Sequence, residues 1–237
     1  MNALSQDLSG PDAVDLSGAC LAIARQLVAG ARLWFAAPRS AGLTGEMVTA
    51  WFIDCDAGQV RVLTVWVEDT WLETLRAGAA AGDVLVLVAG SAELENNGLR
   101  QRAAAWGVLT VWIGNGPRPA PGEADHVLWA GSEKASFDLE SAVAVCELLA
   151  ELTSAHLQHP EAIEPERPGC EEEVCITCSD EGRLGEVVAL GADGLAQVRT
   201  PAGLETVDTT LIDDACPGDL VLIHAGTALS LIAKEAR

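Results

Sequence analysis

The 237-residue sequence is 49% hydrophobic, which is enough to bury one or two ordinary cores. Its 14 Lys and Arg against 35 Asp and Glu give a formal net charge of -21, which would repel a phosphate backbone and excludes nucleic acid as a partner. No apolar run approaches the roughly 18 residues of a membrane span, and the first residues lack the basic start of an export signal. We therefore expect a cytoplasmic protein without a membrane partner.

The first two thirds of the chain alternate helix-like and strand-like segments. In chain order, the pattern predicts a helix at 13–30, strands at 32–37, 59–67 and 83–90, a helix at 93–107, strands at 108–114 and 125–131, and a helix at 137–157. The strand runs are almost continuously apolar, as in parallel strands that are buried on both faces. The pattern predicts an α/β three-layer sandwich with a parallel sheet.

Two loops of this sheet are candidate ligand sites, because ligands of open parallel sheets bind beyond the carboxyl ends of the strands. They read APRSAGLTGE after the first strand and AGSAELENNG after the third. Their small residues would let backbone N–H groups approach a phosphate, although tight connections without a ligand would look the same. The candidate polar contacts are Arg39, Ser40, Thr44, Ser91 and Glu93. An isomerase would also need a base, for which Glu46, Glu93 and His126 are candidates, although each fits better as an ordinary surface or loop residue.

The segment AGDVLVLVAGSAELENNGLRQRAAAWGVLTVWIGNG, with ADHVLWAGS after it, resembles the sugar isomerase (SIS) family in its order of strand, serine-bearing loop, helix and strand. The resemblance covers roughly residues 10 to 157. It implies a fold that binds a phosphosugar, a carbohydrate derivative, and that pairs through helices as a homodimer.

The organisation changes after a Pro-rich and Glu-rich stretch. We place an α/β domain at 1–160, a linker at 161–173 and a second domain at 174–237. The second domain holds short apolar runs separated by Gly, Asp and Pro turns: GEVVAL, LAQVRT, GLETVDTT, DLVLIHA and ALSLIA. This spacing predicts a small all-β barrel of OB-like type.

The seven cysteines fall into isolated residues and a cluster, which call for different explanations. Cys20, Cys55 and Cys146 stand alone in apolar surroundings and read as small core residues. The other cysteines include a cluster suited to metal binding or thiol chemistry, formed by Cys170, Cys175 and Cys178. One interpretation is a structural zinc site completed by Cys216 or His224.

The end of the chain reads VLIHAGTALSLI at 221–232, and a cysteine pair precedes the first strand of the predicted barrel. Together these features resemble the HypC/HupF family of hydrogenase-maturation chaperones. The resemblance implies a non-enzymatic carrier of iron with cyanide and carbon monoxide ligands, Fe(CN)2CO, which works with a HypD-type iron-sulfur scaffold and the large-subunit precursor of a nickel-iron hydrogenase. It implies a cysteine ligand, with Cys178 and Cys175 both open, and His224 as its neighbour.

Overall fold

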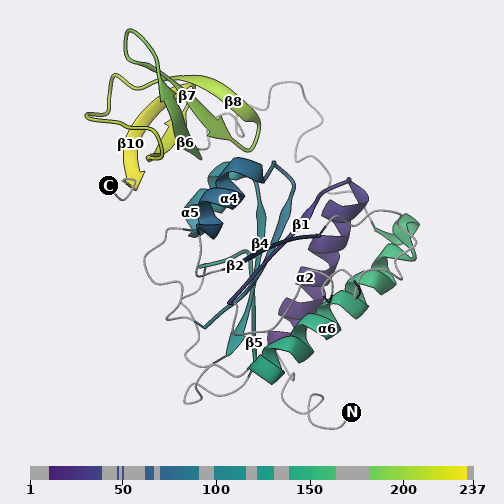
Figure 1. Ribbon diagram of the computed structural model, residues 1–237. Coiled ribbons are helices and arrows are strands. Elements are labelled where there is room, and N and C mark those ends of the chain that lie inside the picture. Colours follow the sequence, from purple (N-terminus) through teal and green to yellow (C-terminus); the bar gives the residue numbers. More distant parts are fainter. Residues whose placement is uncertain are drawn as a thin grey trace. The chain divides into compact units, whose positions relative to one another are not determined.

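The computed structural model describes residues 11–38, 47, 50, 62–66, 70–90, 99–115, 122–130, 139–163 and 182–233. The chain forms two compact units (Figure 1). The first comprises Met1–Gly78, Gly82–Asn97 and Leu109–Pro165, and the second comprises Ala79–Ala81, Gly98–Val108 and Glu166–Arg237. None of the described helices is long and apolar enough to cross a lipid bilayer.

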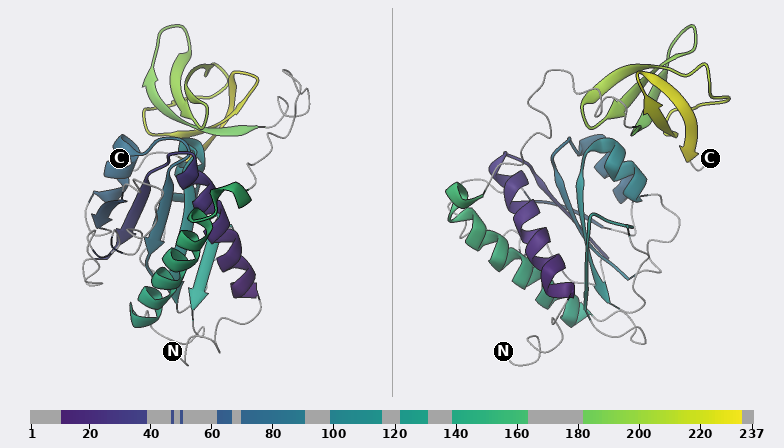
Figure 2. Two further views of the ribbon diagram at one scale, coloured as in Figure 1. Left: turned by 90° about the vertical axis from the view of Figure 1, so that its right-hand side faces the viewer. Right: turned by 180° about the vertical axis from the view of Figure 1, so that it is seen from behind.

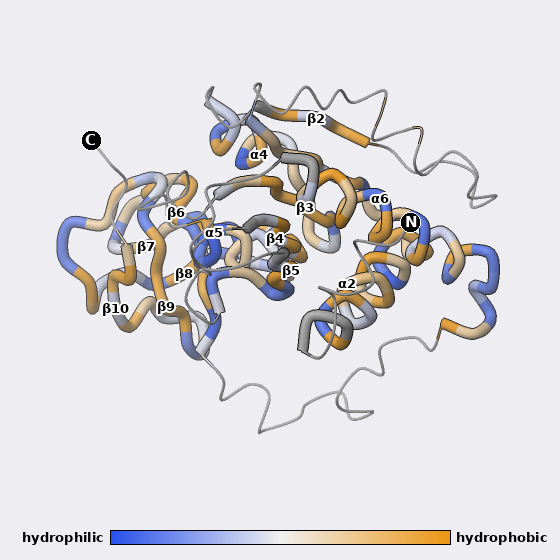
Figure 3. Tube along the Cα trace, turned by 90° about the horizontal axis from the view of Figure 1, so that it is seen from below, coloured by the Kyte–Doolittle hydropathy of each residue, from blue (hydrophilic) through white to orange (hydrophobic). Residues whose placement is uncertain are grey.

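The first unit is built on a five-stranded sheet in which all described pairs are parallel. Its order is β2 (Val62–Trp66), β1 (Leu33–Ala37), β3 (Val84–Val88), β4 (Leu109–Asn115) and β5 (His126–Ala130). The strands carry mostly hydrophobic residues (Figure 3), and β1 and β3 are buried along their whole length. The predicted parallel sheet is confirmed.

Helices lie on both faces of this sheet. The long helices α2 (Pro11–Val28) and α6 (Leu139–Leu157) pack side by side on one face (Figure 2). Their apolar side chains join alternate strand residues in one core cluster. On the other face, α4 (Trp71–Gly78) places Gly78 so close to Trp34 that an added Cβ would lie 2.7 Å from the indole ring.

Two carboxylates form hydrogen bonds at the amino ends of strands in this sheet. Asp83 is 3% exposed and accepts hydrogen bonds from the Arg32 guanidinium at 2.6 Å and from the Trp34 indole N–H at 2.9 Å. Asp125 accepts from both the backbone N–H and the hydroxyl of Thr110, each at 2.7 Å. Each carboxylate sits just before a strand, so these bonds help to fix where β3 and β5 begin.

The second unit contains a closed barrel of five strands, which confirms the predicted small all-β fold. The strands are β6 (Arg183–Leu190), β7 (Leu195–Thr200), β8 (Gly203–Asp208), β9 (Leu220–His224) and β10 (Thr227–Ala233), and their order around the barrel is β10, β8, β7, β6, β9. Small and branched apolar residues fill the interior: Val187, Ala196, Val198, Val207, Val221, Ile223 and Ala228.

Helix α5 (Leu99–Trp106) also belongs to the second unit, and it packs against β6, β7 and β9. The sequence pattern placed a helix at 93–107, of which 93–98 lie outside the described residues. The short helix η3 (Pro160–Ala162) falls at the predicted start of the linker. The boundaries proposed at 160 and 174 stay a prediction.

Candidate functional site

One of the residues assigned to the metal site is described. His224 ends β9, whereas Cys175 and Cys178 lie outside the described residues. The same holds for Cys170 and for every candidate of the two phosphosugar loops: Arg39, Ser40, Thr44, Ser91 and Glu93. His224 and the strands that lead toward it form the described part of the site.

His224 is half-buried at one rim of the barrel and stands opposite Thr227 across a tight hairpin. The two turn residues, Ala225 and Gly226, have φ values of 47° and 79°. Two consecutive positive φ values are typical of a type I′ turn, whose twist matches that of the flanking strands. The carbonyl of Gly226 accepts a hydrogen bond from the Asp208 N–H at 3.0 Å. This bond ties the hairpin to β8 and fixes the backbone around His224.

Strand pairing brings the start of β6 to the same rim. In the antiparallel β6–β9 ladder, Arg183 stands opposite Ile223, the residue before His224. Cys178 precedes Arg183 by five residues, so their Cα atoms can be at most about 18 Å apart along the chain. For Cys175, eight residues before Arg183, the limit is about 29 Å. Arg183, the residue from which both limits are counted, lies at the end of the barrel that carries His224.

Cys216 lies at the other end of β9. Its backbone N–H donates to the Asp219 carboxylate at 2.9 Å, and its Sγ lies 3.7 Å from the carbonyl oxygen of Asp214. A strand from Leu220 to His224 spans about 13 Å, so Cys216 and His224 cannot bind the same ion. Within the described ranges no three His, Cys, Asp or Glu side chains gather as a metal site would require. Of the two residues considered to complete a zinc site, His224 is the one on the rim where β6 begins.

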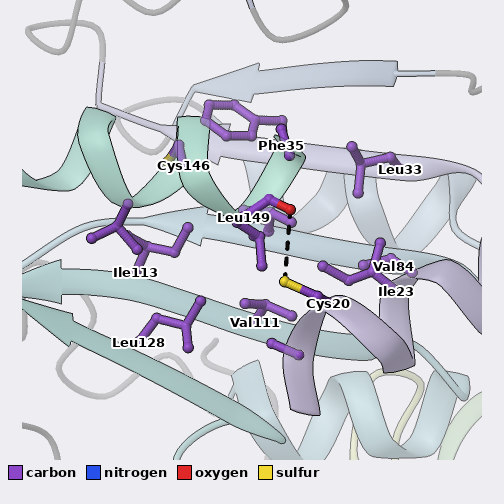
Figure 4. Close-up of a cluster of buried hydrophobic side chains, with 14 of the residues drawn as sticks. Cys20, Ile23, Leu33, Phe35, Val84, Val111, Ile113, Leu128, Cys146 and Leu149 are labelled. Atoms are coloured by element: carbon purple, nitrogen blue, oxygen red, sulfur yellow. Dashed lines mark hydrogen bonds between the residues drawn. The ribbon is translucent and has the colours of Figure 1, made fainter. Parts of the chain in front are cut away.

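Two isolated cysteines lie in the core, as predicted. Cys20 on α2 and Cys146 on α6 are 0% and 3% exposed (Figure 4). Burial raises the pKa of the Cys20 thiol to about 11 and that of Cys146 to about 12, because an apolar surrounding disfavours the thiolate. Neither is suited to bind or transfer a metal at neutral pH. Cys55 lies outside the described residues.

In the first unit, the strand order reverses between β1 and β3. In doubly wound sheets this switch point opens the crevice where ligands bind. The two candidate loops follow these two strands. At the end of β3, Ala89 donates its N–H to Ile113 at 3.2 Å and its carbonyl accepts the Trp112 indole N–H at 2.9 Å. The backbone that leads into the second loop is therefore held from both sides.

His126 does not join this edge. It is the first residue of β5, at the amino end of a parallel strand, whereas the candidate loops start from the carboxyl ends. Its ring faces α2, where an added Cβ on Gly18 would lie 3.5 Å from the imidazole Cε1. The suggestion that His126 serves as a base for a ligand in those loops is wrong for geometric reasons. Glu46 and Glu93 lie outside the described residues.

The fold and the rim geometry define a small β-barrel domain with a histidine hairpin, preceded by an α/β unit. Residues 183–237 match the HupF/HypC family. They form a HupF/HypC domain, as the VLIHAG resemblance indicated. No curated protein sequence matches the chain.

The chain is similar to solved structures with which it shares little sequence identity. The sugar isomerase domain of an RpiR transcription factor from Sphaerobacter thermophilus is 22% identical, with a TM-score of 0.47, over 68% of this chain and 84% of that one. A phosphoheptose isomerase from Francisella tularensis is 12% identical, also at 0.47, over 62% and 87%. The phosphoheptose isomerase GmhA from Neisseria gonorrhoeae is 14% identical, at 0.40, over 65% and 88%.

Proposed function

We propose that the protein is a non-enzymatic assembly chaperone of nickel-iron hydrogenases, whose barrel carries iron with cyanide and carbon monoxide ligands as cargo. Cys178 or Cys175 is the iron ligand, and His224 lies beside it. The chaperone receives the cargo with a HypD-type iron-sulfur scaffold and passes it to the large-subunit precursor. Cytoplasmic location and a homodimer stay predictions.

The observation that carries this proposal is the β6–β9 register. It places the strand that follows the cysteine segment opposite Ile223, next to His224. A thiolate is a soft, strongly donating ligand suited to iron, and it must be accessible for the metal to be handed on. A nearby imidazole can hydrogen-bond to the thiolate or to an iron-bound ligand and orient it. The HupF/HypC match of residues 183–237 supports hydrogenase maturation as the setting.

The proposal is tested by anaerobic purification from a hydrogenase-expressing cell that lacks its own family member. We expect the wild-type chain to carry iron and to show cyanide and carbonyl infrared bands, and Cys178→Ser to lose both together with hydrogenase maturation. Cys175→Ser, tested in parallel, decides between the two thiols. Cys216→Ser is the matched control, because that thiol lies at the other end of β9, and it should retain the cargo. Full maturation in the Cys175→Ser/Cys178→Ser double variant would contradict the proposal.

A second candidate function, phosphosugar binding, is supported by the strand order that reverses between β1 and β3. Arg39, Ser40 and Thr44 follow β1, and Ser91 and Glu93 follow β3. We expect sugar phosphates to raise the melting temperature, since a ligand at about 100 times its Kd stabilises by about 2.7 kcal/mol. Arg39→Ala should remove the shift, and no shift at millimolar sugar phosphate argues against this function.

A further inference from the structure

Glu186 is a charged residue on the outside of the barrel that is almost completely buried. It is 2% exposed and precedes Val187, whose side chain fills the interior. Because successive strand residues point to opposite faces, Glu186 belongs to the outer surface. A carboxylate in such a place must be paired, because an unpaired buried charge is very costly.

Both oxygens of this carboxylate are bound by helix α5. Arg102 Nη1 donates to Glu186 Oε1 at 3.0 Å, and Trp106 Nε1 donates to Glu186 Oε2 at 2.7 Å. The same Arg102 nitrogen also donates to the carbonyl of Gly218 at 2.9 Å, in the turn before β9. Arg102 and Trp106 are one helical turn apart, so a single face of α5 reaches β6 and this turn together.

Two further residues on the outer face near Glu186 extend this surface, one apolar and one cationic. Leu220, opposite Glu186 in the ladder, is fully buried, although the alternation with Val221 and Ile223 places it on the outer face. From β7, Arg199 sets its guanidinium 5.2 Å from the centre of the Trp106 ring, within cation–π range. Three neighbouring strands thus supply the carboxylate of Glu186 on β6, the apolar side chain of Leu220 on β9 and the guanidinium of Arg199 on β7.

The chemistry of this contact is that of a docking site. Arg and Trp are enriched among the residues that dominate protein–protein binding energy. A buried ion pair adds little net stability and can fix orientation, and an eight-residue helix is marginal in isolation. The HupF/HypC match starts at residue 183, so α5 is not part of the family domain whose surface it covers.

We propose that the outer face formed by Glu186, Arg199, Gly218 and Leu220 is a docking surface for a short helix with Arg and Trp four residues apart, and that α5 is its intramolecular occupant. The proposal does not depend on iron transport. It implies that a helix of the same pattern from another molecule competes with α5 for this face. The barrel then has a partner site that is closed while α5 is bound.

The test uses the full chain with its own anchors removed, Arg102→Ala/Trp106→Ala, and a fluorescent peptide of residues 98–108, GLRQRAAAWGV. We expect the peptide to bind this variant at least tenfold more tightly than the wild-type chain, in which α5 competes. Adding Glu186→Gln to the variant should weaken binding at least tenfold, because Gln loses the charge and one acceptor. A peptide with Ala in place of both Arg102 and Trp106 is the matched control and should not bind.

Two results overturn the proposal. One is no peptide binding by the double variant when its circular dichroism shows that it is folded. The other is equal binding of the native and the Ala-substituted peptide. If the double variant does not fold, the titration is made with Trp106→Phe, which removes only the indole N–H. The native peptide must then still bind more tightly than to the wild-type chain, and failure to do so counts against the docking surface.

Discussion

Arg183, the first residue of β6, stands opposite Ile223 in the antiparallel ladder between β6 and β9. This pairing puts the start of β6 at the same end of the barrel as His224. Two residues further along β6, Gly185 lies close to the interior side chains of Val198 and Ile223. Adding a side chain at Gly185 therefore tests the packing that this ladder produces.

We expect Gly185→Ala to destabilise the barrel by about 1–3 kcal/mol, the usual cost of overpacking a core. An added Cβ would lie 2.5 Å from Val198 Cγ1 and 2.6 Å from Ile223 Cδ1. Hydrogen exchange of the β6 amides measures the loss. Gly182→Ala is the control, because its nearest neighbour is the flexible tip of Leu222 at 3.0 Å, and its effect should stay below about 0.5 kcal/mol. Equal exchange in both variants would contradict this view of the ladder.

The strands of both units were predictable because their signal is local. Apolar runs at 83–90 and 108–114 became β3 and β4 with ends shifted by a few residues at most. The place of α5 was not predictable in this way. Its anchor, Arg102, is 84 residues from Glu186, and no periodicity within a helix reports a partner so far along the chain. Sequence order alone assigned α5 to the α/β domain.

The site was predictable only in part. The VLIHAG resemblance singled out His224, but the barrel order in which β6 pairs with β9, passing over β7 and β8, is a long-range pairing that hydropathy does not reveal. That pairing is what puts the start of β6 at the end of the barrel that carries His224. His126 shows the same limit of sequence reasoning, since residue type made it a candidate base while the end of the strand on which it lies decides what it can reach.

Thiol labelling should separate the core cysteines from the rest. With pKa values of about 11 and about 12, Cys20 and Cys146 hold on the order of 100 to 1,000 times less thiolate than a thiol at the reference value of 9.0. We expect iodoacetamide at pH 8 to modify half-buried Cys216 in the native protein and to leave both core thiols unmodified. Peptide mass spectrometry measures this, and denaturation should expose all of them. Labelling of Cys146 at the rate of Cys216 would be the contrary result.

Removing the carboxylate of Asp83 should weaken the first unit strongly. We expect Asp83→Ala to lower the free energy of unfolding by about 2–4 kcal/mol, because Arg32 and the Trp34 indole would lose their common acceptor. Urea unfolding followed by tryptophan fluorescence gives the value. Glu123→Gln changes an exposed acidic residue of the same unit and should cost less than about 0.5 kcal/mol. A similar small loss for Asp83→Ala would show that the buried carboxylate is dispensable.

The free energy of unfolding should depend on pH in part through His126. Burial against α2 lowers the pKa of this imidazole below 6.5. This effect of burial outweighs the negative charges of Asp125 and Asp15, which raise the pKa. The unfolded chain therefore takes up a proton at His126 before the folded chain does. It follows that this residue has no effect on stability well above pH 6.5 and that it reduces stability as the pH falls through its ordinary value.

We expect the free energy of unfolding to fall less between pH 7.5 and 5.5 in His126→Gln than in the wild type, because Gln cannot bind the proton. Urea unfolding at both pH values measures the difference, and the contributions of the acidic residues cancel in the comparison. His159→Gln is the control, since that side chain is 71% exposed, and it should keep the wild-type slope. Parallel pH curves for the wild type and His126→Gln would mean that the imidazole titrates in the folded chain as it does in the unfolded one.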